Sequence, residues 1–182
     1  MIERQPILTD RLLLEPISTV HAEPLWEATR GSLETLERWM PWAQKASEAN
    51  SREFTERSEA DWDAGTDYAF AVLKDGRYLG GVGLHMDRLD GLGQIGYWIR
   101  TEQVRNGYAT EAAGALLVLG FEKAGLYRLE LRAGVDNKAS QRVAEKLGFV
   151  KEGVLRKGCP LGPGKAYDCY LFGLLAQDWR TA

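Results

Sequence analysis

Apolar positions in the first third of the chain recur mainly at helical spacing. Asn50 is followed three residues later by Glu53, which resembles a capping box at the start of one of these helices, and Gly65 is placed to end it. The spacing predicts helices over 21–30, 33–39 and 52–64, after a short strand over 12–17.

From residue 68 onward the pattern changes to short apolar and aromatic runs separated by turn residues. Asp75 and Gly76 lie between two such runs, and Asp-Gly in this setting is a hairpin signal. Helical spacing returns in two segments that each end in a Gly followed by an apolar residue. We expect strands over 68–73, 78–86, 95–99, 128–135, 149–155 and 166–175, and helices over 110–123 and 138–146.

Length and composition restrict the class of protein. The chain has 182 residues, which can bury a substantial core, and no linker or low-complexity tract divides it, so a single domain over 1–182 is expected. Its net charge of −3 gives no support to a nucleic-acid or anionic membrane surface. Cys159 and Cys169 lack metal-ligand spacing, and no apolar run reaches membrane-span length. We therefore expect reduced thiols, no metal, and a cytoplasmic location.

The segment from Arg105 to Ala112 has the character of an anion-binding turn. Gly107 tolerates backbone angles that other residues avoid, and it precedes a helix whose first N–H groups have no internal partners. These donors and the positive end of the helix dipole favour a phosphate. The residues expected to bind it are Arg105, Asn106, Gly107, Tyr108, Ala109 and Thr110.

A second segment, 136–149, makes the interpretation of the segment from Arg105 to Ala112 more specific. Together the two resemble the acetyl-CoA-binding core of the GNAT acetyltransferase superfamily. Further segments are similar to its RimJ/RimL branch of N-terminal protein acetyltransferases, so that the resemblance spans nearly the whole chain. These segments are Thr9 to Leu14, Trp39 to Trp42, Ile95 to Ile99, Tyr167-Asp168 and Gln177 to Trp179.

The resemblance implies an α/β (α+β) GNAT fold, a mixed and mostly antiparallel twisted sheet of about seven strands flanked by helices. It also implies acetyl-CoA as cosubstrate, with the pyrophosphate on the turn at 105–110 and the pantetheine arm paired to the strand residues Tyr97, Trp98 and Ile99. Gly96 can accommodate a bulge that separates this strand from the next and exposes its edge. Trp98 is equally expected as a core aromatic, and the two roles can coexist.

Two polar residues of the segment 136–149 are candidates for the donor site. The resemblance implies that Asn137 bonds the pantetheine arm and that Ser140 lies near the thioester sulfur; alternatively, Asn137 only caps the last helix. Many family members carry on this helix a Tyr that protonates the departing CoA, and this chain has Ala144 at that position. Our hypothesis is that Ser140 assists the leaving thiolate instead.

The base and the acceptor site are less clearly marked. Some family members use a carboxylate on the central strand, where this chain has Gln94, so Asp67 and His85 become candidates that act through water. Each also has a simpler interpretation, Asp67 as a loop acid and His85 as a solvent-facing strand residue. Trp39 and Trp42 resemble the aromatic segment that walls the acceptor site, or they serve packing alone.

These observations predict an N-acetyltransferase whose acceptor is a primary amine, foremost the N-terminal α-amine of a protein of the ribosomal type. Two alternatives stay open: an enzyme that acetylates a small-molecule amine such as an antibiotic, a polyamine or an amino acid, and a non-catalytic acyl-CoA-binding sensor. No nucleic-acid or membrane partner is expected, and a homodimer is possible.

Overall fold

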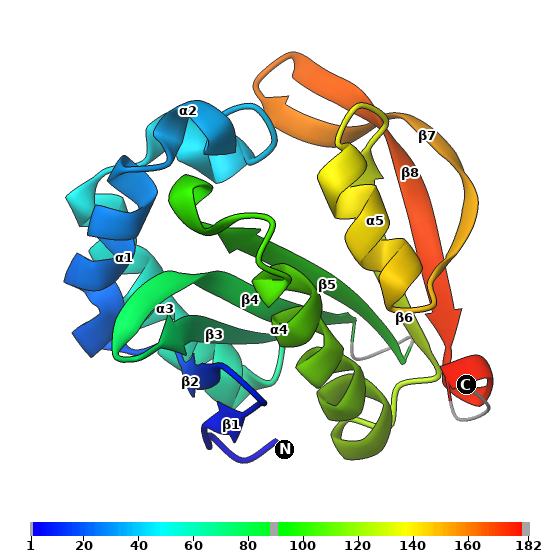
Figure 1. The fold of residues 1–182 in the computed structure, drawn as a ribbon, viewed down its shortest axis with the longest axis horizontal. Helices are drawn as coiled ribbons and strands as arrows, with labels where there is room; N and C mark the ends of the chain where they lie inside the picture. Colours follow the sequence, from blue (N-terminus) through cyan, green and yellow to red (C-terminus); the bar gives the residue numbers. More distant parts are fainter. Residues whose placement is uncertain (1, 88–90, 180–182) are drawn as a thin grey trace.

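The computed structural model describes residues 2–87 and 91–179. Within these residues one sheet of eight strands has the order β1-β2-β3-β4-β5-β6-β8-β7, and β5 with β6 is its parallel pair (Figure 1). The mixed, mostly antiparallel sheet is as expected, and the short β1 brings the number above seven. The strands are β1 (Ile7–Leu8), β2 (Leu13–Pro16), β3 (Asp67–Lys74), β4 (Arg77–Asp87), β5 (Leu92–Ile99), β6 (Arg128–Gly134), β7 (Val150–Gly162) and β8 (Lys165–Leu175).

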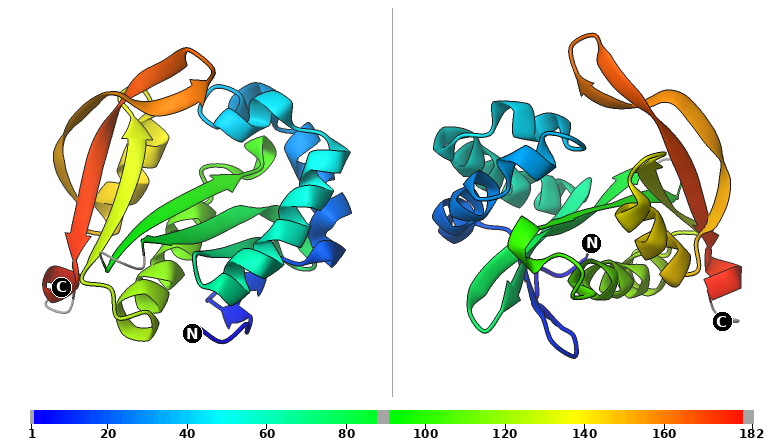
Figure 2. Two further views of the ribbon diagram at one scale, coloured as in Figure 1. Left: turned by 180° about the vertical axis from the view of Figure 1, so that it is seen from behind. Right: turned by 45° about the horizontal axis from the view of Figure 1, so that its top comes forward.

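Helices cover the two faces of the sheet unequally. The first group lies against the N-terminal half of one face, and α4 and α5 lie on the opposite face (Figures 1 and 2). The first group is η1 (Thr19–His21), α1 (Ala22–Arg30), α2 (Leu33–Leu36), η2 (Pro41–Lys45) and α3 (Glu48–Ala64). The others are η3 (Thr101–Gln103), α4 (Tyr108–Val118), the π-helical turn η4 (Leu119–Lys123), α5 (Lys138–Lys146) and α6 (Ala176–Trp179). No helix in the described part of the chain is both long and apolar enough to span a membrane.

Helix α3 begins before the expected position, so the predicted capping box at Asn50 and Glu53 is wrong. Ser47 is in an extended conformation, and its side-chain oxygen accepts the N–H of Asn50 at 3.1 Å. This places the helix start at Glu48. Gly65 ends the helix in the left-handed conformation with φ 65°, as predicted.

The other helix boundaries differ in the same modest way. The segment expected to be helical over 33–39 is α-helical only to Leu36, and Pro41 then starts the short η2. Helix α4 begins at Tyr108 rather than at residue 110. The predicted hairpin at Asp75 and Gly76 is confirmed, because both residues have the positive φ that this turn requires (49° and 74°).

The sheet separates two apolar clusters. On the α4 and α5 face, Leu84, Leu116 and Leu129 are fully buried, and Ile95 joins them from β5. On the α1 and α3 face, Ala71 and Tyr78 pack with Ile17, Leu25 and Ala28. Because side chains alternate along a strand, neighbouring residues of β5 belong to different clusters. Tyr97 packs against the first cluster and Trp98 against the second.

The most consequential feature of the sheet is the divergence of its two parallel strands. β5 and β6 pair only from Leu92 to Gln94, opposite Arg128 to Glu130, and then separate towards the top of the molecule (Figure 2, left). β5 remains paired with β4 through Gly96 without a register shift, so the expected bulge at Gly96 is wrong. The sheet opens because β6 follows β8 beyond Glu130 while β5 follows β4. We call the divergence of these two strands beyond Gln94 and Glu130 the splay.

Candidate active site

The turn at 105–110, hereafter the anion turn, has the backbone geometry expected of an anion site. Arg105 and Gly107 have positive φ (68° and 82°), and Gly107 is the N-cap of α4. The first bond of this helix runs from the N–H of Glu111 to the carbonyl of Gly107 at 3.0 Å. The N–H groups of residues 108–110 therefore precede the helical ladder and are free of helical partners. Such a helix start binds phosphate well.

Asn137 and Ser140 lie in the first turn of α5. The Asn137 side-chain oxygen accepts the N–H of Ser140 at 3.1 Å, which is the capping role considered from the sequence. The Ser140 side chain reaches β5, where its Oγ lies 2.8 Å from the hydroxyl of Tyr97. Ser140 is thus held by the sheet as well as by its own helix.

Sequence reasoning placed Tyr97 on the strand expected to pair with the pantetheine arm, but it missed the Tyr97 hydroxyl as a partner of Ser140. This hydroxyl contacts both Oγ and, at 3.3 Å, the carbonyl oxygen of Ser140. Burial raises the pKa of Tyr97 to about 12, and the hydrogen bond with Ser140 opposes this only in part. Ala144, the position of the usual family Tyr, is fully buried in the core. Strand alternation over 95–99 was the available signal, because it places Tyr97 on the same face as Ile95.

Asp67 and His85 form a pair on the other face of the sheet. They are directly opposite each other on β3 and β4, with His85 Nδ1 3.5 Å from Asp67 Oδ2. The His85 side chain is 69% exposed and that of Asp67 is 40% exposed. Burial raises the pKa of Asp67, and the neighbouring His85 counteracts this only partly. Gln94 on β5 is directly opposite His85 on β4.

The sheet surface beside this pair carries little side-chain bulk. Gly83 and Gly96 are paired on β4 and β5, and a Cβ at Gly96 would meet no atom within 4 Å. By strand alternation, this open surface is on the face that carries Asp67, His85 and Gln94. We call it the glycine floor. Ser140 and Tyr97 lie on the opposite face, so the structure does not bring the proposed acid and the proposed bases together.

Trp98 lies at the upper end of the glycine floor. Its ring is 5.8 Å from that of Trp42 and 6.3 Å from that of Tyr78, and its indole nitrogen lies against Gly81. The core-aromatic role considered for Trp98 is therefore present. Its neighbour Ile99 is partly buried against the opposite cluster.

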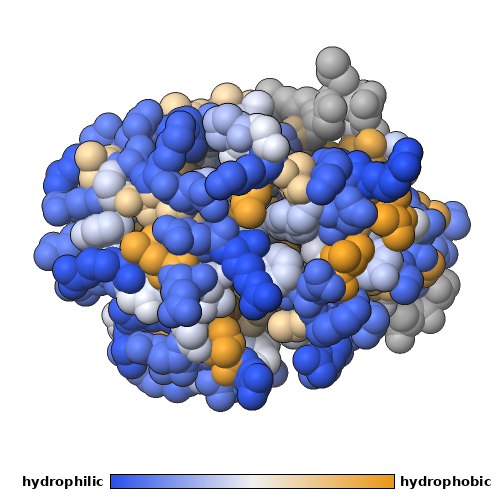
Figure 3. All heavy atoms as spheres, turned by 90° about the horizontal axis from the view of Figure 1, so that it is seen from above, coloured by the Kyte–Doolittle hydropathy of each residue, from blue (hydrophilic) through white to orange (hydrophobic). Residues whose placement is uncertain are grey.

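Trp39 contacts the other half of the sheet. Its ring packs edge-on against Tyr167 at 5.7 Å and closely approaches Gly134 at the end of β6. The Tyr167 hydroxyl also donates to the Trp39 carbonyl at 2.8 Å. Trp39 therefore packs against the β6 side of the splay, and Trp42 against the β5 side. The face seen from above is mainly hydrophilic, with hydrophobic residues in small separate groups (Figure 3).

Within the described ranges, no group of three or more His, Cys, Asp or Glu side chains could hold a metal ion. Cys159 and Cys169 are both free thiols.

Comparison with known proteins gives consistent results. The model of the family described as "Acetyltransferase (GNAT) domain" matches residues 11–150. The chain is 32% identical to "Putative ribosomal N-acetyltransferase YdaF" of Bacillus subtilis, over 92% of this chain and 91% of that protein. It is 24% identical to the "Ribosomal-protein-serine acetyltransferase" of Escherichia coli, over 82% and 85% of the two chains. Among solved structures, the microcin C7 self-immunity acetyltransferase MccE in complex with acetyl-CoA and AMP superposes with a TM-score of 0.84, at 25% identity and over 92% and 93% of the chains.

Proposed function

The chain belongs to the GNAT acetyltransferase family and is an N-acetyltransferase, and from this premise we propose that it transfers acetyl from acetyl-CoA to the N-terminal α-amine of a protein of the ribosomal type. The observation that carries this proposal is the splay. It opens next to the anion turn on one side and the glycine floor on the other, so that donor and acceptor can enter from opposite faces.

The donor side fits acetyl-CoA in three respects. The anion turn offers backbone N–H groups and a helix start for the pyrophosphate. Beyond Gln94 no described strand pairs with the edge of β5 that faces the splay, and this edge can bond an extended amide-bearing arm as a further strand would. Ser140 stands on α5, across the splay, where the thioester end of such an arm would lie. The bound donor supplies the activated acetyl group.

The chain's own residues then take part in two proton transfers. Ser140 Oγ donates a proton to the departing thiolate sulfur, and the Tyr97 hydroxyl holds Oγ in position and can pass a proton back to it. On the other face, the attacking amine loses a proton through water to Asp67, whose raised pKa makes it a better base than an ordinary carboxylate. Holding the two reactants together provides the largest part of the rate increase.

Because Asp67 is a weak base, an α-amine is favoured over a lysine side chain as the acceptor. A protein α-amine has a pKa of about 7.7–8.0 and a lysine about 10.4, so a lysine needs roughly 3.5 kcal/mol more for deprotonation at neutral pH. Gln94 occupies the strand position at which a carboxylate would otherwise be expected, and Asp67 lies two strands away. The names of the Bacillus subtilis and Escherichia coli relatives point to the same class of acceptor.

A small-molecule amine remains the second candidate acceptor. The observation that favours it is the similarity to MccE, an acetyltransferase solved with acetyl-CoA and AMP. A site for a small-molecule acceptor is expected to be short and enclosed. The glycine floor of this chain is instead open at Gly96.

The experiment that decides between them measures thiol release from acetyl-CoA with a panel of acceptors. The panel contains peptides with ribosomal-protein N-termini, the same peptides with a blocked N-terminus and a free lysine, polyamines, amino acids and aminoglycosides. We expect release only with free α-amines on peptides. Release only with small amines would overturn the proposed acceptor, and tight CoA binding without release from any amine would indicate a sensor.

A further inference from the structure

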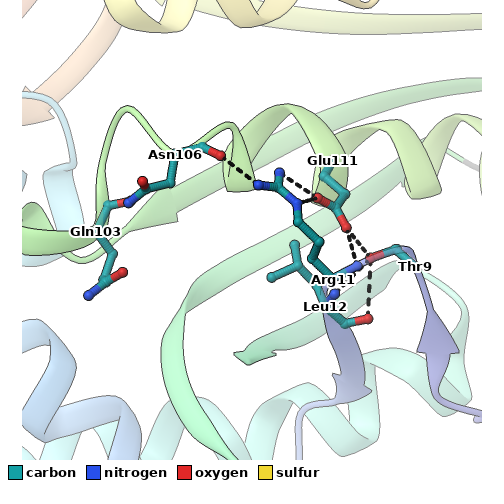
Figure 4. Close-up of polar contacts among 6 residues, drawn as sticks. All are labelled: Thr9, Arg11, Leu12, Gln103, Asn106 and Glu111. Atoms are coloured by element: carbon teal, nitrogen blue, oxygen red, sulfur yellow. Dashed lines mark hydrogen bonds and ion pairs between the residues drawn. The ribbon is translucent and has the colours of Figure 1, made fainter. Parts of the chain in front are cut away.

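The turn between β1 and β2 lies against the start of α4. In this turn the N–H of Thr9 donates to the Leu12 carbonyl at 2.9 Å, and the Thr9 hydroxyl oxygen accepts the N–H of Leu12 at 3.0 Å. This closed turn directs the side chain of Arg11 towards α4 (Figure 4). The N-terminal hairpin thereby contacts the proposed donor site from a part of the chain about a hundred residues away in sequence.

Three hydrogen bonds and one ion-pair contact join this turn to the Glu111 carboxylate. Arg11 donates through Nε to Oε2 at 2.8 Å, and its Nη2 lies 2.7 Å from the same oxygen. The N–H of Arg11 and the hydroxyl of Thr9 both donate to Oε1, at 2.8 and 2.6 Å. A carboxylate whose two oxygens are both bonded in this way, one of them by a guanidinium, is held in one orientation. We call Thr9, Arg11 and Glu111 the latch.

Arg11 also contacts three consecutive residues of the anion turn. Its Nη1 donates to the carbonyl of Asn106 at 3.0 Å, and its guanidinium lies 4.9 Å from the ring centre of Tyr108. Its Nη2 lies 3.3 Å from the position that a Cβ would take on Gly107. The Arg11 side chain therefore contacts the carbonyl of Asn106, the ring of Tyr108 and the side of Gly107 on which other residues carry a Cβ.

The latch also controls the charge next to the turn. Burial favours the neutral form of Glu111, but the hydrogen bonds from Thr9 and Arg11 outweigh it and lower the pKa of this carboxyl. Glu111 is therefore ionised at neutral pH, one residue after the free amides of the helix start. Without Arg11 this negative charge would be unpaired close to a bound pyrophosphate and would repel it.

We propose that Arg11 is a positioning residue for the donor, which holds the anion turn in its binding conformation and neutralises Glu111. This inference rests on the proposed donor site at the anion turn. It concerns a residue that would not itself touch the reacting atoms, so its removal should weaken CoA binding and leave the chemical step nearly unchanged.

Arg4 offers a matched control on the same N-terminal segment. Its Nη2 donates to the Glu59 carbonyl at 2.7 Å and lies 3.2 Å from Asp63 Oδ1, and its side chain is 34% exposed, against 46% for Arg11. It attaches the N-terminus to α3 and has no contact with the anion turn among the interactions of the described residues. Arg4→Ala therefore removes arginine contacts of a similar kind to those of Arg11 without altering the anion turn.

The test measures CoA affinity by calorimetry and the KM and kcat for acetyl-CoA in Arg11→Ala, Arg11→Lys and Arg4→Ala. Arg11→Ala should raise Kd and KM about tenfold while kcat changes less than about twofold, because charge-assisted bonds to the turn are lost. Arg11→Lys keeps the charge but cannot bond Glu111 and Asn106 as a fork, so its effect should be intermediate. Arg4→Ala should leave Kd unchanged, and an equal effect of Arg4→Ala and Arg11→Ala would overturn the proposal.

A double variant separates positioning from simple stabilisation. If Glu111 repels the donor once Arg11 is absent, then Arg11→Ala/Glu111→Gln should bind CoA more tightly than Arg11→Ala alone. A double variant that binds no more tightly would show that charge neutralisation is not part of the role. Thermal unfolding of each variant checks that the fold is intact before affinities are compared.

Ala109→Pro distinguishes failure of this proposal from failure of the donor site. Proline is tolerated in the first helical turn and removes one of the amides proposed to bind the pyrophosphate. If folded Ala109→Pro binds CoA as tightly as the unsubstituted chain, then the donor site itself is wrongly placed. If it loses affinity while Arg11→Ala does not, the donor site stands and only the role of Arg11 fails.

Discussion

The hydroxyl of Tyr97 on β5 lies 2.8 Å from Oγ of Ser140 on α5, and this contact bridges the splay. It connects the strand that carries the glycine floor to the helix that carries the proposed acid. A phenol whose pKa is raised by burial to about 12 stays protonated at neutral pH. The Tyr97 hydroxyl can therefore replace the proton that Ser140 is proposed to give up at the thioester end of the proposed donor site.

Tyr97→Phe should lower kcat about tenfold and leave the KM for acetyl-CoA within about twofold, because Ser140 loses its partner while the anion turn is intact. Ser140→Ala should show the same split between kcat and KM. Since the two hydroxyls act as one unit, the double variant should be little slower than the slower single variant. Steady-state thiol release checks this, and unchanged turnover in Ser140→Ala would rule out the proposed acid.

Two glycines of β5 should respond to substitution in opposite ways. Gly96→Leu should keep the free energy of unfolding, because its side chain enters open space, but it should raise the KM for the acceptor by covering the glycine floor. Gly93→Ala should cost about 1–3 kcal/mol, because its Cβ would lie 2.6 Å from Leu126 and 2.8 Å from Leu129 in the core. Urea unfolding and acceptor kinetics on both variants check this, and an unchanged acceptor KM in Gly96→Leu would place the acceptor elsewhere.

The role of Asp67 as base predicts a particular pH dependence. Asp67 accepts a proton only when ionised, so kcat/KM should fall as the pH drops through its raised pKa. Asp67→Asn should lower kcat/KM about tenfold near neutral pH and remove this acid limb. His85→Gln removes a neighbour that lowers the pKa of Asp67, so the limb should move to higher pH. A pH profile of Asp67→Asn that matches that of the unsubstituted chain would exclude Asp67.

The latch predicts a pH-dependent contribution to stability. A carboxyl whose pKa is lower in the folded than in the unfolded state stabilises the fold above its unfolded pKa, and this contribution disappears as the pH falls through its folded pKa. Glu111 is such a group. Glu111→Gln should therefore lower the free energy of unfolding by about 1.5 kcal/mol near pH 7 and by much less at acid pH.

Urea unfolding at both pH values measures this difference. Glu48→Gln is a suitable control, because among the described residues Glu48 has an exposed ion pair with Arg52 at 3.8 Å and a place in the first turn of α3, and such exposed charge interactions contribute little. A Glu111→Gln effect that is equally large at both pH values would contradict an ionic latch.

Much of the site was predictable from local sequence. The anion turn was recognised because glycine at 107 and a helix start at that point are both local properties, and the structure gives Gly107 the positive φ that this requires. Asn137 as a cap and Gly65 as a helix end were likewise local. The capping box at Asn50 was wrong because a better-placed oxygen, that of Ser47, lies just upstream.

Contacts between distant segments were not predictable in this way. Arg11 and Glu111 are 100 residues apart, and Tyr97 and Ser140 are 43 apart, so no periodicity or spacing relates them. The divergence of β5 and β6 was expected from a bulge at Gly96, yet it arises because each strand follows a different antiparallel partner. The position of Asp67 beside His85 required the register of β3 and β4.

Local sequence was enough to predict most of the helices and strands, the glycine turn before α4 and the acetyltransferase family, because backbone preferences and short motifs depend on neighbouring residues. Tertiary structure alone decided where the sheet opens, which hydroxyl meets Ser140 and which side chain holds the anion turn. Those arrangements depend on strand register and on packing between segments far apart along the chain, since a shift of one residue in register turns a side chain to the other face of the sheet.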